Sequence, residues 1–257
     1  MKTRLTIIAA ALVVTLAGSA HAVAIISVNF SGRADTSNTV PDTLLVESGT
    51  SSTGIAGVNG NDVWNDIIAT GGGSGSIGAT AVAGPAGEDA TVAASWGGTW
   101  GASASGNRMA AAENPTGDMT DGHIEGSSPT AINITIADLL EDFSYGYSLY
   151  LYVGDDAGDR SGSFFVNGDN GTLQSFTSTV NPDETGLTQG SNYLVFSDLS
   201  SDTLTITGGG DDNSNRTGVW GFEIVGNPPP PVPEPSGVLL ASITLAGLAT
   251  FRRRRRR

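Results

Sequence analysis

The stretch YGYSLYLYV, residues 145–153, has the composition and the alternation of a β-strand. Its large side chains fall on both faces of an extended chain, with Tyr147, Leu149, Leu151 and Val153 on one face and Tyr150 and Tyr152 on the other. Large side chains on both faces are typical of a strand that is covered on both sides. We therefore expect a central strand here.

Similar short runs occur on both sides of this stretch. They are rich in β-branched and aromatic residues, are separated by Gly, Ser, Asn and Asp, and cover residues 24–30, 43–47, 91–96, 131–136, 163–167, 172–178, 192–199, 203–207 and 218–225. Ile132, Ile134 and Ile136 alternate with polar residues, so this strand should have one wet face. About ten short strands separated by turn residues predict an all-β fold, an antiparallel β-sandwich.

Four segments do not follow the strand pattern. Residues 61–68 and 136–143 have the spacing of short helical turns. Residues 71–90 and 101–126 are rich in small residues, mainly Gly, Ala and Ser, so they can bury little apolar area, and we expect long loops. Such loops either bind ligands or only connect strands.

The start of the chain has the pattern of a secretory signal peptide. A basic segment, MKTR, precedes an apolar run from Leu5 to Gly18 and the small-x-small sequence Ala20-His21-Ala22. We expect residues 1–22 to be removed and residues 23–226 to fold as one exported domain. The chain has no cysteine, so that domain must be stable through its hydrophobic core alone.

The charge of the expected domain is strongly negative. The chain has 12 basic and 26 acidic residues. Between residues 23 and 231 the only basic residues are Arg33, Arg108, Arg160 and Arg216, whereas Glu234 is the only acidic residue outside that range. Nucleic acids and anionic membrane surfaces attract basic patches, so this balance argues against both as partners.

The C-terminal region has three parts of different composition. Residues 227–231 form a proline-rich linker, residues 236–251 are mostly apolar, and Arg252, Arg253, Arg254, Arg255, Arg256 and Arg257 end the chain. An apolar helix of this length is roughly 24 Å long, which is marginal for crossing a bilayer. By the positive-inside rule the arginines would stay in the cytoplasm and stop translocation.

The segment 232–257 resembles the PEP-CTERM sorting signal of exported proteins from Gram-negative bacteria. The resemblance rests on Val232, Pro233, Glu234 and Pro235, followed by the apolar helix 236–251 and the arginine cluster 252–257. It implies an inner-membrane precursor, processing by an exosortase as well as by signal peptidase, and a mature form at the cell surface or in the extracellular matrix. A permanent C-terminal anchor would explain the helix and the arginines but not the PEP motif.

The expected domain is itself similar to the galactose-binding-like jelly-roll domains carried by such proteins. The similarity rests on ISVNF, VWND, YSLYLYVGDD and GVWGFEIV. It bears on the fold and not on an activity.

The residue inventory excludes several kinds of catalysis in the exported domain. There is no cysteine nucleophile, no lysine for a Schiff base or a P-loop, and one histidine, His123, which we expect to be a solvated loop residue. Pairs of carboxylates are abundant, and two suffice for glycoside cleavage. Since sequence alone selects no pair, we expect no enzyme.

Three loop clusters carry the oxygen ligands that calcium prefers. They are Asp155, Asp156 and Asp159; Asn167, Asp169 and Asn170; and Asp211, Asp212, Asn213 and Asn215. The third begins like an EF-hand loop but has Arg216 where that loop needs glycine. Turns in which Asp and Asn bond their own backbone have the same composition.

Two tryptophans near glycines are candidates for sugar stacking. Trp96 and Trp100 lie four residues apart in the sequence SWGGTW. Burial in the core is the commoner role of tryptophan in a small β-domain, and we expect it for Trp220, which alternates with Phe222 and Ile224.

We therefore expect an exported protein with a structural or adhesive role in an exopolysaccharide layer. The first alternative is a carbohydrate-binding module, calcium-dependent if one of the clusters binds Ca2+. The second alternative is a polysaccharide-modifying enzyme.

Overall fold

The computed structural model describes the greater part of the expected domain. The described residues are 23–32, 57–59, 64–69, 74–97, 102–104, 122–154, 160–167, 171–178, 187–211 and 217–230. The chain divides into two units, residues 1–227 and 228–257, and all described strands belong to the first.

The described residues are all-β. Their strands are β1 (Ile25–Gly32), β2 (Asn65–Ala69), β3 (Gly75–Ala83), β4 (Asp89–Trp96), β5 (Ala102–Ala104), β6 (Gly122–Gly126), β7 (Ile132–Ala137), β8 (Tyr147–Gly154), β9 (Arg160–Asn167), β10 (Thr172–Ser178), β11 (Tyr193–Leu199), β12 (Leu204–Gly210) and β13 (Thr217–Gly226). Every predicted strand is present except 43–47, which lies outside the described residues.

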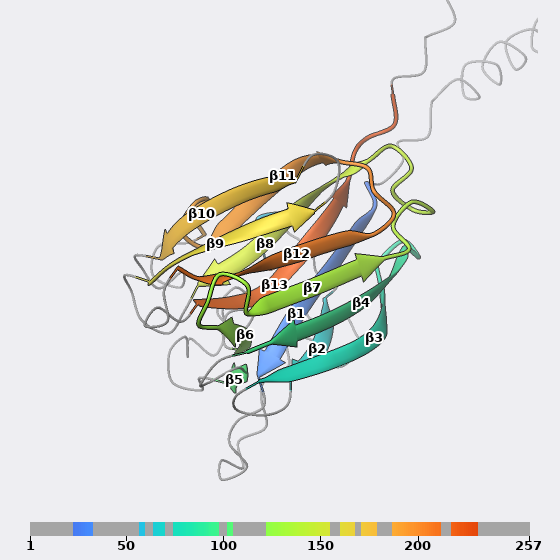
Figure 1. Cartoon of the computed structure of the whole chain (residues 1–257). Coiled ribbons are helices and arrows are strands. Elements are labelled where there is room, and N and C mark those ends of the chain that lie inside the picture. The colour runs from blue at the N-terminus through green and yellow to red at the C-terminus, as the bar shows by residue number, and fades with distance from the viewer. Residues whose placement is uncertain are drawn as a thin grey trace, which may run out of the picture. The chain divides into compact units, whose positions relative to one another are not determined.

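The strands form two sheets (Figure 1). The seven-stranded sheet has the order β11-β8-β13-β1-β2, with β6 beside the first part of β13 and β5 beside β6. The six-stranded sheet has the order β10-β9-β12-β7-β4-β3. All described pairs are antiparallel except β1 with β2, which is parallel.

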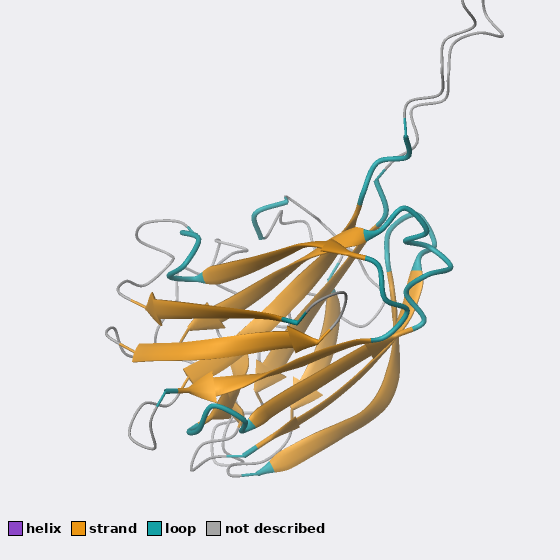
Figure 2. Ribbon diagram, turned by 45° about the horizontal axis from the view of Figure 1, so that its top comes forward, coloured by secondary structure: helices purple, strands orange, loops and turns teal. Residues whose placement is uncertain are grey.

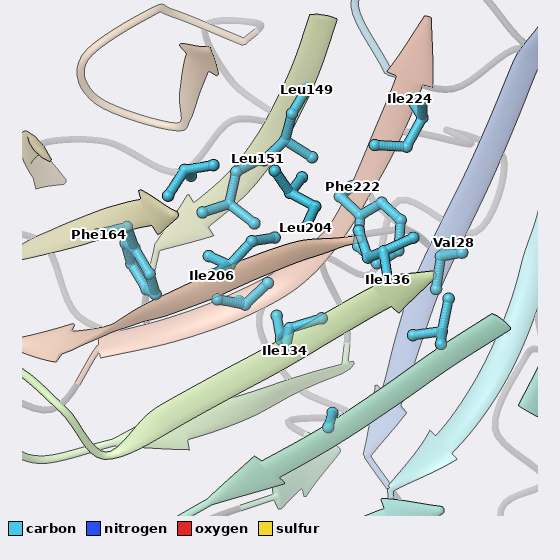
Figure 3. Packing of buried hydrophobic residues seen from close by; sticks show 14 of the residues in the cluster. Val28, Ile134, Ile136, Leu149, Leu151, Phe164, Leu204, Ile206, Phe222 and Ile224 are labelled. Carbon is cyan, nitrogen blue, oxygen red and sulfur yellow. The ribbon is translucent and has the colours of Figure 1, made fainter. Parts of the chain in front are cut away.

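The two sheets lie face to face, and the main core fills the space between them (Figures 2 and 3). Val28, Leu151 and Phe222 point inward from the seven-stranded sheet, and Ile134 and Ile206 from the six-stranded sheet. The alternation of Ile132, Ile134 and Ile136 is confirmed, since all three are buried while Asn133 is exposed. The arrangement is that of a β-sandwich.

Strand β8 is central, as residues 145–153 predict. It lies between β11 and β13. Its residues Tyr147, Leu149, Leu151 and Val153 belong to the main core, whereas Tyr150 and Tyr152 contact a second, aromatic cluster on the other face.

Four segments differ from their predictions. Residues 65–69 form β2 and not a helical turn, while 136–143 complete β7 and then make one turn closed by the Phe143 N–H and the Leu139 carbonyl. The predicted loop 71–90 contains β3, and the predicted loop 101–126 contains β5 and β6. In β3 a register shift between Ile77 and Thr80 breaks the alternation that identifies a strand.

Side-chain amides join the two sheets at their edges. The Asn65 amide of β2 donates to the Ala83 carbonyl of β3 at 2.7 Å and accepts from the Ala83 N–H at 3.0 Å. At the other edge the Gln174 amide of β10 donates to the Val195 carbonyl of β11. These bonds cover edge backbone groups that would otherwise be open to another strand.

Both ends of the described domain lie at one end of the sandwich, which we call the exit end. There the Gly226 N–H donates to the Ala24 carbonyl and the Asn227 N–H to the Gly146 carbonyl, both at 2.8 Å. The described residues contain no helix long and apolar enough to cross a membrane. The predicted helix 236–251 lies outside them.

Candidate functional site

The outer face of the seven-stranded sheet carries polar side chains that are nevertheless buried. They alternate with core residues of β1, β6 and β13 and comprise Ser27, Asn29, His123, Glu125 and Glu223. The outer face of a sheet in a two-layer fold is ordinarily wet. A buried polar row on that face is therefore the most unusual chemical feature of the described domain, and we treat it as the candidate site.

Glu223 is the centre of a hydrogen-bonded group that we call the Glu223 hub. Its carboxylate accepts from the Tyr152 hydroxyl, from the Asn59 amide at 2.8 Å and from the Ser27 hydroxyl at 3.3 Å. The Tyr152 hydroxyl in turn accepts from the Val58 N–H at 2.9 Å. Residues 57–59 are thus fastened to β8 and β13 by side chains of the sheet.

An aromatic cluster encloses the hub. Trp64, Tyr152 and Trp220 are its fully buried members, and Tyr150, Tyr193 and Leu187 pack against them. The Trp64 and Tyr152 ring centroids are 6.0 Å apart, which is within the range of favourable tilted aromatic pairs. Tyr152 belongs to both groups, so the Glu223 carboxylate lies beside buried aromatic rings.

A β-bulge places Trp220 in this cluster. The pairing of β13 with β8 shifts register between Val219 and Gly221. Val219 and Phe222 both belong to the main core as a result, and Trp220 lies on the opposite face. Trp220 is buried as predicted, but its predicted alternation with Phe222 and Ile224 is wrong because of the extra residue.

Burial raises the pKa of the Glu223 carboxyl above its ordinary value of 4.5, although the hydrogen bonds from Tyr152, Asn59 and Ser27 partly oppose the change. Burial also raises the pKa of the Tyr152 phenol above its ordinary value of 10.0, and the adjacent Glu223 raises it further. Both effects disfavour charge inside the hub.

The raised pKa of Glu223 predicts a specific pH dependence of stability. The folded state binds the Glu223 proton more tightly than the unfolded state does. The stability that protonated Glu223 contributes is therefore complete below the ordinary pKa of 4.5, and it is lost as the pH rises through the folded-state pKa. The free energy of unfolding of the native protein, minus that of Glu223→Gln, should therefore fall as the pH rises above the ordinary value of 4.5. Urea unfolding of both proteins at a series of pH values measures the difference, and a difference independent of pH would contradict the raised pKa.

The sequence suggested that His123 is a solvated loop residue, and this prediction is wrong. It lies in β6, its exposed fraction is 2%, and its Nε2 is 3.5 Å from the nearer Glu125 oxygen. The Gly-rich surroundings gave no sign of β6, which pairs with the start of β13 through Ile124 and Val219.

Of the predicted calcium ligands, the structure describes only Asn167 and Asp211. They lie at the end of β9 and directly after β12, and both are exposed. Asp211 accepts a long hydrogen bond from the Ser163 hydroxyl at 3.4 Å. Among the described residues no three His, Cys, Asp or Glu side chains are grouped as metal ligands. Outside the described residues lie Asp155, Asp156, Asp159, Asp169, Asn170, Asp212, Asn213 and Asn215.

The sugar-stacking role considered for Trp96 is contradicted by its position. Trp96 ends β4 with its ring in the main core and an exposed fraction of 3%, and Gly75 packs directly on the ring. No face of this ring is free for a ligand. Trp100, the sorting motif 232–235 and the arginine cluster 252–257 lie outside the described residues.

The Glu223 hub has the properties of a structural clamp. Both oxygens of its carboxylate accept hydrogen bonds from within the protein, and the aromatic cluster covers the group. A substrate would have to displace these donors. The hub therefore positions residues 57–59 over the sheet.

Comparisons with known proteins give no family for this chain. No protein-family model matches it, and no curated protein matches it. Among solved structures, an alignment with the insecticidal crystal protein Cry2Aa has a TM-score of 0.25 and 18% identity, and it covers 42% of this chain and 17% of the other. The chain thus spans less than a fifth of that protein, and so low a TM-score carries no argument.

Proposed function

We propose that the chain is an exported protein that an exosortase sorts to the cell surface or the extracellular matrix, where its β-sandwich has a non-catalytic, structural or adhesive role. The observation that carries the proposal is the order of three features: the motif Val232 to Pro235, the apolar segment 236–251, and the arginine cluster 252–257. The apolar segment would hold the precursor in the membrane and the arginines would stop its translocation. The motif Val232 to Pro235 resembles the part of the signal that an exosortase recognises.

The described domain is compatible with a passive role. Its most enclosed polar group, the Glu223 hub, is fully engaged internally. Its edges are joined by Asn65 and Gln174, which protects an exported protein without disulfides from strand addition. The jelly-roll topology and the C-terminal helix are part of this proposal.

The mature protein should lack the C-terminal anchor. Intact-mass spectrometry of protein purified from the source cells is expected to find residues 1–22 and 236–257 absent. Changing Pro233 and Pro235 together to alanine should leave a precursor that retains the arginines in the membrane fraction. Replacing Pro229 and Pro230 of the adjacent linker is the matched control and should leave processing intact. An arginine cluster retained in the mature native protein would contradict the sorting proposal.

A further inference from the structure

The outer face of the six-stranded sheet carries little charge. In the described strands of this sheet the only charged residues are Asp89 and Arg160, and each is the first residue of its strand. The chain as a whole carries a net charge of −14. The described middle part of this sheet face is therefore an uncharged surface on a strongly acidic protein.

Acidic side chains flank this face at both ends of its strands. At the exit end the Asp142 carboxylate accepts from the Asp89 N–H at 2.8 Å, and the Asp202 carboxylate accepts from the Leu140 N–H at 3.1 Å. Asp138 and Glu141 lie in the same connection between β7 and β8. At the opposite end the exposed Asp211 follows β12 and accepts from the Ser163 hydroxyl at 3.4 Å. The uncharged part of the face thus lies between acidic connections.

Register aligns one row of side chains across all six strands of this face. Successive members are paired residues of neighbouring strands: Leu173, Phe165, Thr207, Asn133, Ser95 and Ser76. We call this set the neutral row. It begins with two apolar side chains and continues with hydroxyl and amide groups at the strand spacing of about 4.8 Å.

The neutral row is open to solvent. Leu173 and Phe165 are 63% and 39% exposed. Asn133, Ser95 and Ser76 are also exposed, and Thr207 is half-buried. Leu173 and Phe165 are paired neighbours, so they form one adjacent pair of exposed apolar side chains at one end of the row.

We propose that the neutral row binds a chain of an uncharged polysaccharide laid across the strands. Phe165 and Leu173 offer apolar contact to the C–H face of a sugar ring, and the hydroxyl and amide groups can both donate to and accept from sugar hydroxyls. No member of the neutral row carries a charge that has to be stripped of water when such a ligand binds.

The charge of the protein favours an uncharged polysaccharide over other ligands on this face. A polyanion is repelled by the net charge of −14, and a polycation is drawn to the acidic connections and not to a neutral face. A second copy of the chain carries the same negative charge and is repelled likewise. The proposal rests on the proposed adhesive function and gives it a surface and a class of ligand.

The test is a binding titration of the full chain in detergent against amylose, cellohexaose and galactomannan, with the anionic polymer alginate for comparison. We expect saturable binding of at least one neutral glycan, none of alginate, and no effect of EDTA, because the neutral row contains no carboxylate. Thr207→Glu, Asn133→Glu and Phe165→Ala should each weaken binding by about tenfold or more.

Matched controls carry the same changes outside the neutral row. Ser144→Glu and Leu140→Ala alter exposed residues in the connection between β7 and β8, and binding should stay unchanged. Thermal unfolding of each variant verifies folding. Asn133→Glu, at an exposed position, remains as the test if Thr207→Glu unfolds.

Four outcomes would overturn the proposal. They are no saturable binding of any neutral glycan, binding unaffected by the row variants, binding that requires calcium, or a concentration-dependent dimer that Thr207→Glu disrupts. The first three leave the sorting of the chain untouched, since intact mass measures that independently. The fourth would make a second copy the occupant of this face.

Discussion

Replacing Glu223 with alanine is expected to lower the free energy of unfolding by about 3 kcal/mol near neutral pH. The substitution removes the common acceptor of Tyr152, Asn59 and Ser27 from a position that is completely buried. The donors lose their partner where water cannot easily replace it, and the truncated side chain leaves a void. Urea denaturation followed by circular dichroism measures the change.

Two further variants show whether the hydrogen bonds of the Glu223 hub are responsible for the loss of stability. Glu141→Ala removes an exposed glutamate at the exit end and should change stability by no more than about 0.5 kcal/mol. Tyr152→Phe removes only a hydroxyl group and should cost about 1.5 kcal/mol, because the Val58 N–H and Glu223 both lose a bond. If Glu223→Ala were as stable as Glu141→Ala, the hydrogen bonds of the hub would only offset the cost of burying the carboxyl.

Local patterns predicted most of the strands but not the hub. Alternation along 131–136 and 145–153 is a property of neighbouring residues, so the sequence displays it directly. Glu223 and Asn59 are 164 positions apart, and Glu223 and Tyr152 are 71 apart. No local spacing connects such residues, and a glutamate between Phe222 and Ile224 fits the wet face of an ordinary strand equally well.

The missed strands have physical reasons of their own. β3 exposes most of its residues, and Val82 is its one fully buried side chain, so its apolar signal is weak even before the bulge. β6 contains a histidine and a glutamate, His123 and Glu125, on the outer face of the seven-stranded sheet. They are buried because that face is covered. In both cases tertiary packing, and not intrinsic strand preference, decides the conformation.

Two buried rings on the outer face of the seven-stranded sheet depend on a pair of glycines that the sequence did not single out. Gly154 of β8 pairs with Gly218 of β13. A Cβ atom on Gly154 would lie 2.1 Å from Trp220 Cη2, and one on Gly218 would lie 2.6 Å from His123 Cδ2. The two rings therefore rest directly on the backbone, which only glycine permits.

Gly154→Ala is expected to lower the free energy of unfolding by about 3 kcal/mol. The added methyl group meets three atoms of a rigid indole that is 1% exposed, so the ring has to leave its position in the cluster. Chemical denaturation measures the loss, and the tryptophan fluorescence spectrum should shift because Trp220 changes its surroundings.

Gly78→Ala is the matched control, since it adds the same methyl group to strand β3 with no atom within 4 Å, and it should be neutral or slightly stabilising. Combining Gly154→Ala with Trp220→Leu should cost less than the sum of the two single changes, because the smaller side chain relieves the overlap. Strict additivity of the two changes, or equal stability of Gly154→Ala and Gly78→Ala, would mean that the Trp220 ring does not lie over β8.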